Sequence, residues 1–197
     1  MSIIFREKSY SGRRNAIWRE PKVLPGGFAL AQTFAAGTLL KRGTLVNVDT
    51  SLMRAGIVKV GKVLNGGTTT APRVSKDNYL MAGDTVMKVG SDITSTVASV
   101  DRSNEDYDVV TLTTAMSGLE EGNYIQEADT SGNSPVAAYE PNAVLAADRT
   151  IMENDLPTVD VAWQALVIRK ATQSFPDSFL TSSIALTNNH NILFIYE

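Results

Sequence analysis

The sequence contains no cysteine, one histidine and no long apolar run. The absence of cysteine excludes disulfides, thiolate metal sites and a cysteine nucleophile. One histidine, His190, is too few for an ordinary zinc site, and no Gly-x-Ser-x-Gly segment supplies a serine nucleophile for it. No stretch approaches the roughly 18 apolar residues of a membrane helix, and the N-terminal segment lacks the apolar centre of a secretory signal. We therefore expect a protein with no enzymatic activity, no cofactor and no membrane partner.

Charge is distributed unevenly along a chain of otherwise average composition. The 197 residues are 43% hydrophobic and 20% charged, which is enough apolar material for a substantial core. Residues 1–25 carry six Lys and Arg against two Glu, a net charge of +4, so the rest of the chain carries −7 of the total of −3. A basic arm on an acidic body can bind an acidic partner, nucleic acid or a neighbouring copy. The acidic pI of about 5.3 argues against nucleic acid as the main partner.

The clearest strand pattern lies between residues 80 and 128. Four short runs rich in β-branched residues, at 85–89, 94–100, 107–113 and 123–126, are separated by polar or glycine turns. This spacing predicts a small antiparallel β-barrel or sandwich. Eight carboxylates and one arginine lie between Asp101 and Asp129, so this module is the acidic part of the chain.

Flexible sequence on both sides of this module indicates an insertion into a larger body. The two links are the Gly- and Thr-rich segment 66–72 and the segment 129–135. We predict an extended basic arm at 1–27, a β body formed by 28–78 and 136–197, and an inserted acidic β-module at 79–130.

The fold predicted for the whole chain is mainly β. The body is expected to be a compact β-sandwich or tulip-like unit. Segment 157–171 favours a strand because β-branched residues dominate it, although a helix with one apolar face also fits. Pro176 and Asp177 favour one short helix over 179–186, and the apolar residues 192–196 predict a buried terminal strand.

The arm carries large side chains that a free tail would leave exposed to water. Helix breakers at 11–14 and 21–27 exclude a long helix, so the arm is expected to lie against its own body, a sister subunit or a partner. Trp and Arg are enriched at the centres of protein interfaces. The predicted contact residues are Arg6, Tyr10, Arg13, Arg14, Trp18 and Arg19.

Two patterns resemble ligand sites in part. Residues 56–62 match the first seven positions of a phosphate-binding loop, but Val63 stands where Ser or Thr should meet the magnesium ion. In the acidic turn, the candidate calcium ligands are Asp101, Asn104, Glu105, Asp106 and Asp108, with Asp101, Asp106 and Asp108 as the candidate metal residues. The spacing does not match an EF-hand loop, so we interpret these residues as a solvated hairpin turn and expect no metal site, with the three aspartates as weak candidates only.

The layout as a whole resembles the head fibre and head decoration (auxiliary capsid) proteins of tailed bacteriophages. The resemblance rests on three parts: the β-region at 36–43 after an extended arm, the inserted module with 83–84 and runs at 96–101, 108–112 and 122–125, and an ending formed by 161–169, 180–186 and 191–196. The chain departs from the members that carry a long fibre shaft, because no segment here could form one.

The resemblance implies a homotrimer on the outer surface of a virion capsid, made in the cytoplasm of the bacterial host. It implies the major capsid protein as partner, a decorating or stabilising role, and no catalytic residues. The arm would contact the capsid or a sister subunit, and the acidic module would point outward. The alternative is a β-type binding module or adhesin that recognises glycans or a host surface, for which Tyr107, Tyr124 and Tyr139 would supply aromatic faces.

Overall fold

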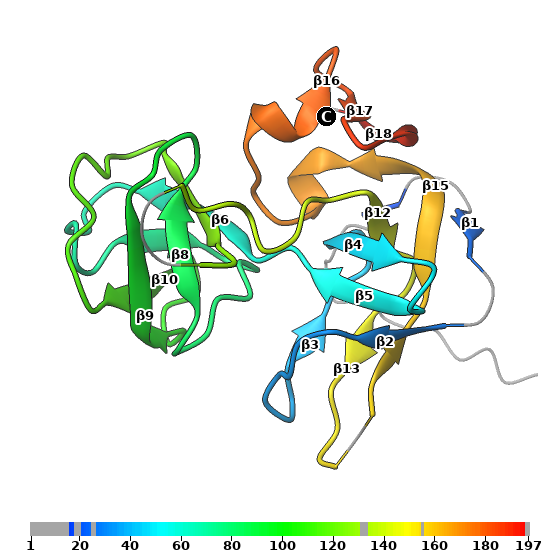
Figure 1. The fold of residues 1–197 in the computed structure, drawn as a ribbon, viewed down its shortest axis with the longest axis horizontal. Coiled ribbons are helices and arrows are strands. Elements are labelled where there is room, and N and C mark those ends of the chain that lie inside the picture. The colour runs from blue at the N-terminus through cyan, green and yellow to red at the C-terminus, as the bar shows by residue number, and fades with distance from the viewer. Residues whose placement is uncertain (1–15, 18–20, 25–26, 131–133, 155, 196–197) are drawn as a thin grey trace, which may run out of the picture.

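The computed structural model describes residues 16–17, 21–24, 27–130, 134–154 and 156–195. Over these residues the fold is mainly β, as predicted, and the helical residues form two three-residue 3₁₀ helices, η1 (Arg169–Ala171) and η2 (Asp177–Phe179). No helix in the described part of the chain is long and apolar enough to cross a membrane. Figure 1 shows two lobes, a body that contains both ends of the described chain and a smaller barrel beside it.

The body is built on a ten-stranded sheet. Its strand order is β14-β2-β5-β4-β12-β15-β18-β17-β16, with β1 paired to β15 outside this path, and β3 and β13 form a separate two-stranded sheet. The strands are β1 (Lys22–Val23), β2 (Phe28–Leu30), β3 (Leu39–Leu40), β4 (Leu45–Asp49), β5 (Arg54–Ile57), β12 (Ala143–Leu145), β13 (Arg149–Thr150), β14 (Thr158–Val159), β15 (Val161–Ile168), β16 (Leu180–Thr181), β17 (Ala185–Leu186) and β18 (Asn189–Ile195).

Both faces of the central strands are buried. Successive residues of a strand point to opposite faces, so Leu45 and Val46 of β4 belong to two different apolar clusters. In β12, Val144 lies in the first cluster while Ala143 and Leu145 lie in the second. The first cluster packs under β18 with Phe175 and Phe194, and the second packs under the β3–β13 pair. Burial on both faces explains why β12 is a continuous apolar run and β15 is nearly one.

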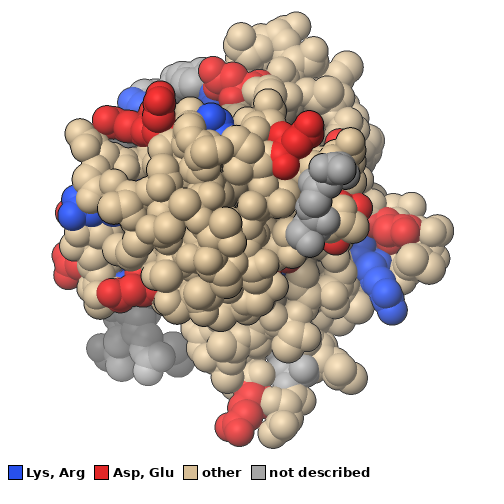
Figure 2. All heavy atoms as spheres, turned by 60° about the vertical axis from the view of Figure 1, so that its left-hand side comes forward, with Lys and Arg blue, Asp and Glu red and all other residues tan. Residues whose placement is uncertain are grey.

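The smaller lobe is a closed six-stranded barrel in the order β10-β7-β6-β11-β8-β9. Its strands are β6 (Val60–Leu64), β7 (Arg73–Ser75), β8 (Thr85–Lys88), β9 (Thr94–Asp101), β10 (Tyr107–Leu112) and β11 (Tyr124–Glu127). Inward-pointing residues such as Val74, Val97, Val110 and Ile125 fill it. With the barrel turned forward, Figure 2 shows a broad central area that has no charged side chains. Carboxylates lie around the margin of this area.

Two details differ from the sequence prediction. The barrel begins at Val60 rather than at residue 79, because β6 and β7 close it by pairing with β11 and β10. The predicted short helix at 179–186 is wrong: only the three-residue η2 precedes a hairpin of β16 and β17, and β17 pairs with β18. Pairing along the sheet outweighs the weak local preference for a helix in so short a segment. The predicted strands within 157–171 and at the C-terminal end are confirmed by β15 and β18.

The described part of the arm follows the free edge of β15. Ile17 forms an antiparallel bridge with Val167 and is 2% exposed, so this arm residue belongs to the body's core. Lys22 and Val23 continue the same edge as β1, opposite Gln164 and Ala162. The base of the arm is therefore an added edge strand.

Candidate functional site: a groove between the body and the barrel

A groove with a volume of about 700 Å³ lies between the β2–β3 loop of the body and one end of the barrel. This is within the size range of small-molecule sites. The body contributes an apolar wall, and the barrel contributes a polar wall. Its lining residues are Phe34, Ala35, Ala36, Gly37, Thr38, Leu39, Lys41, Lys76, Asp77, Asn78, Tyr79, Met81, Arg102, Glu105 and Asp108.

The apolar wall is the loop at residues 34–39. Gly37 has a φ of 86°, which turns the loop back toward β3. The Gly37 amide donates to the carbonyl of Ile151, and the Ile151 amide donates to that of Thr38, at 2.8 and 2.9 Å. Phe34 is buried against the Tyr79 ring, edge to face at 6.5 Å between centroids. The wall is thus fixed at one end to Ile151 of the body and at the other to Tyr79, which follows β7.

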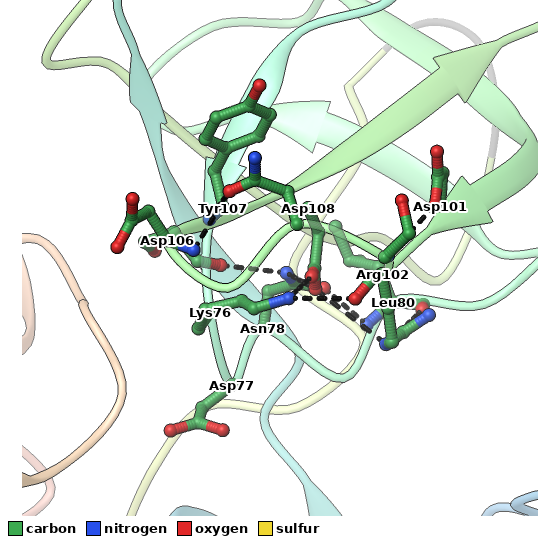
Figure 3. A network of polar contacts seen from close by, with 12 residues as sticks. Lys76, Asp77, Asn78, Leu80, Asp101, Arg102, Asp106, Tyr107 and Asp108 are labelled. Carbon is green, nitrogen blue, oxygen red and sulfur yellow. Dashed lines mark hydrogen bonds and ion pairs between the residues drawn. The ribbon is translucent and has the colours of Figure 1, made fainter.

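The polar wall is organised around Asp108, whose side chain is 3% exposed. Lys76 Nζ lies 2.6 Å from Asp108 Oδ1, and Asn78 Nδ2 donates to Oδ2 at 2.8 Å. Arg102 Nε is 3.7 Å from Oδ2, while the Arg102 NH2 group donates to the carbonyl of Leu80 at 2.6 Å. Figure 3 shows these side chains converging on Asp108 from separate segments of the barrel. A buried carboxylate is tolerated here because several donors surround it.

The segment that carries Lys76 and Asn78 has an unusual backbone. Asp77 and Tyr79 have φ angles of 62° and 59°, in the left-handed region that non-glycine residues rarely adopt. Asp77 forms an ion pair with Lys41 of the body. The Tyr79 hydroxyl accepts a hydrogen bond from the Lys41 amide at 3.1 Å. Strained conformations of this kind are concentrated at binding sites, where the surrounding structure holds them in place.

A second polar cluster joins the two lobes away from this wall. Lys59, between β5 and β6, has a side chain only 1% exposed, and its Nζ lies 2.7 Å from Asp84 Oδ1 and 2.8 Å from Glu127 Oε1. Gln32 of the body donates to Glu127 Oε2 at 3.1 Å, and the same Gln32 amide pairs with both backbone groups of Ile57. The cluster therefore fixes the barrel to the body through one buried cation and two carboxylates.

Burial shifts the pKa of Glu127 in this cluster. Desolvation raises the pKa of Glu127 above its ordinary value of 4.5, and the nearby Asp84 carboxylate raises it further. The hydrogen bonds and charge of Lys59 act in the opposite direction but do not offset the desolvation. Burial also raises the pKa of Tyr139, with Glu127 as the second cause.

The predicted metal residues are not brought together. The Asp101 carboxylate accepts a hydrogen bond from the Ser103 amide in a tight turn, and this bond lowers the pKa of Asp101. In the same turn region the Asp106 amide donates a hydrogen bond to the Asn104 side chain. Figure 3 shows Asp101 and Asp106 on either side of Asp108 and pointing away from it. Among the described residues no group of three His, Asp or Glu side chains could hold a metal ion. Asp108 instead binds two cationic side chains.

The structure explains the glycines of the partial phosphate-loop match at 56–62. Gly56 and Gly61 lie in β5 and β6, so residues 56–62 do not form a phosphate loop. A Cβ on Gly56 would stand 2.2 Å from the Tyr139 ring, and one on Gly61 would stand 2.3 Å from Val74. Close packing, not phosphate binding, requires these glycines.

The remaining candidates are the three tyrosines considered for glycan binding and the arm residues considered for capsid or subunit contact. Tyr124 and Tyr139 pack, partly buried, against the body's first apolar cluster, and Tyr107 lies under Arg73 at 4.6 Å. They therefore form no common exposed platform for a glycan. The predicted arm contacts lie outside the described residues: Arg6, Tyr10, Arg13, Arg14, Trp18 and Arg19.

Sequence reasoning missed both polar clusters. One signal was available: Asp108 alternates with Val110 and Leu112 in the same strand, which places it on the inward face. Lys59 gives no comparable signal, because its partners are 25 and 68 residues away.

Comparisons with protein-family models, with curated proteins and with solved structures find no match to this chain.

Proposed function

We propose that the chain is a structural protein of a tailed-phage virion, which binds the outside of the capsid as a homotrimer and decorates or stabilises the head. The layout of arm, body and inserted module supports this proposal from the sequence. From the structure, the main support is the different surface character of the two lobes. The proposal includes no catalytic role.

The observation that carries the proposal is the distribution of exposed large apolar side chains. Residues 60–127, which form the barrel, are all described and contribute none. The described arm and body contribute Val23, Leu39, Leu52, Met53, Val136, Met152, Leu156, Trp163 and Ile184. Contiguous apolar patches mark surfaces that bind other proteins, whereas single exposed apolar side chains are common on any surface, so the contrast between the two lobes is what supports the proposal. We therefore assign the body to the capsid or subunit side.

The barrel has the surface of a lobe that faces solvent. Residues 60–127 carry ten Asp and Glu against five Lys and Arg, a net charge of −5. The carboxylates lie mostly around the margin of the face in Figure 2. A lobe with net negative charge and no exposed large apolar side chains favours solubility of the particle on which many copies are displayed. The buried Lys59 cluster holds this lobe at a fixed position relative to the body.

The arm is the second part of the proposed attachment. Its base is fixed on the edge of β15 by Ile17 and β1, so residues N-terminal to Ala16 start from a defined place on the body. Residues 1–15 carry Arg6, Lys8, Arg13 and Arg14 against Glu7. We assign this basic segment, with Trp18 and Arg19, to contact with the capsid or a sister subunit.

The test is co-sedimentation with heads of the phage that encodes the protein, together with solution mass by light scattering. We expect a mass three times that of the 21.2 kDa chain, or a trimer formed on the head. Removal of residues 1–15 should abolish co-sedimentation and leave the body folded, because Ile17 is retained. Charge reversal at Glu120 and Glu121 of the barrel is the matched control and should leave binding unchanged. Undiminished binding without residues 1–15 would refute the role of that segment, and failure of the intact protein to bind heads would refute the function.

A further inference from the structure

We propose that the groove between the β2–β3 loop and the barrel binds an amphipathic anion, a small molecule with one carboxylate or similar oxyanion on an apolar body. Nothing in the sequence predicts a small-molecule ligand. The proposal rests on the groove alone and is independent of capsid attachment.

The shape and the body wall of the groove suit the apolar part of such a ligand. Its volume of about 700 Å³ is large enough for a drug-sized molecule. Ala35, Ala36 and Leu39 are exposed on one wall, and Phe34 and Met81 also line the groove. These side chains carry no charge and no strong hydrogen-bonding group. An apolar chain can therefore pack against them without separating a polar side chain of the wall from water.

The barrel wall presents two cationic side chains, Lys76 and Arg102, that are positioned by the buried Asp108 carboxylate. Asp108 is buried, whereas the Lys76 and Arg102 side chains that contact it are 32% and 47% exposed. One carboxylate between two cations leaves a net charge of +1. The Arg102 guanidinium is fixed through Nε and NH2, which leaves further N–H donors for a ligand. A positioned guanidinium is well suited to bind an oxyanion through charge-assisted hydrogen bonds.

Three other charges face the groove and set limits on its selectivity. Lys41 and Asp77 form an ion pair and together contribute no net charge. Glu105 is exposed at the rim and makes no ion pair among the described residues, so its charge opposes an anion. The electrostatic preference for an anion therefore depends on Arg102 and Lys76 and is reduced by Glu105. These opposite contributions can be separated experimentally.

The experiment is calorimetric titration of the full-length protein with octanoate and with octanol. Octanoate should bind, and octanol should bind at least tenfold more weakly. Arg102→Gln should weaken octanoate binding roughly tenfold or more, which corresponds to the loss of one charge-assisted hydrogen bond. Glu105→Gln should strengthen it. Lys88→Gln is the matched control: it removes one cation from β8, where Lys88 contacts the Gly118 carbonyl outside the groove, and should change nothing.

A second variant keeps the test independent of the folding of Arg102→Gln. Ala36 is exposed in the loop wall, so Ala36→Trp should fold normally and fill the groove, abolishing octanoate binding. Absence of octanoate binding to the wild type, equal affinity for octanol, or unchanged affinity in Ala36→Trp would each overturn the proposal. Co-sedimentation with phage heads should be the same for all these variants, so failure of this proposal and failure of the attachment function are distinguishable.

Discussion

Replacement of Lys59 by methionine tests whether the buried cluster holds the barrel to the body. Methionine preserves most of the apolar stem but leaves Asp84 and Glu127, 10% and 15% exposed, without their cation. Breaking a buried pair in this way costs about 3–5 kcal/mol. For a chain of this size each kcal/mol lowers the melting temperature by about 2–4 °C, so we expect a decrease of about 6–20 °C. The loss of the Lys59 contact with the Phe34 ring, at 5.8 Å, acts in the same direction.

The assay is differential scanning calorimetry with two further variants. Lys62→Met removes a cation three residues further along, in β6, where Lys62 makes no ion pair among the described residues, and should cost less than about 0.5 kcal/mol. Adding Glu127→Gln to Lys59→Met should regain part of the loss, since a neutral amide is less costly to bury than a carboxylate. A melting temperature for Lys59→Met equal to that of Lys62→Met would refute the assignment of the cluster as the junction.

Three more predictions concern the protonation of Glu127 in the barrel and the packing of the body. Because the folded pKa of Glu127 lies above 4.5, the folded state retains a proton that the unfolded chain has lost. The stability of the wild type relative to Glu127→Gln should therefore fall as pH rises from about 4.5 through the folded pKa. Urea titrations of both proteins at several pH values measure this difference. Gly56→Ala should destabilise by about 1–3 kcal/mol through its contact with the Tyr139 ring, and combination with Tyr139→Leu should reduce that cost. Ile17→Ala should cost about 2–5 kcal/mol by chemical denaturation, whereas an arm that did not pack on β15 would show no change.

Local sequence was sufficient for the strands but not for their partners. The β-branched runs of the barrel and the apolar C-terminal strand are readable because side-chain alternation and turn residues are local properties. The residues of β6 and β7 look like any other short strands, so nothing local distinguishes pairing within the body from pairing with β10 and β11. The predicted boundary at residue 79 differs from the structure for this reason.

Asp108 shows the same limit at a single residue. Its neighbours in sequence, Asp101 and Asp106, are carboxylates, which made a shared metal site a reasonable hypothesis. In the structure, the inward face of β10 separates Asp108 from them and places it beside Lys76, 32 residues away. The chemistry of a carboxylate depends on which cations the fold places beside it. Here the cations are Lys76 of the β7–β8 connection and Arg102 of the β9–β10 turn. Because buried Asp108 positions the Lys76 and Arg102 side chains at the groove, we seek a ligand for these cations and not a metal ion for the carboxylates of the turn.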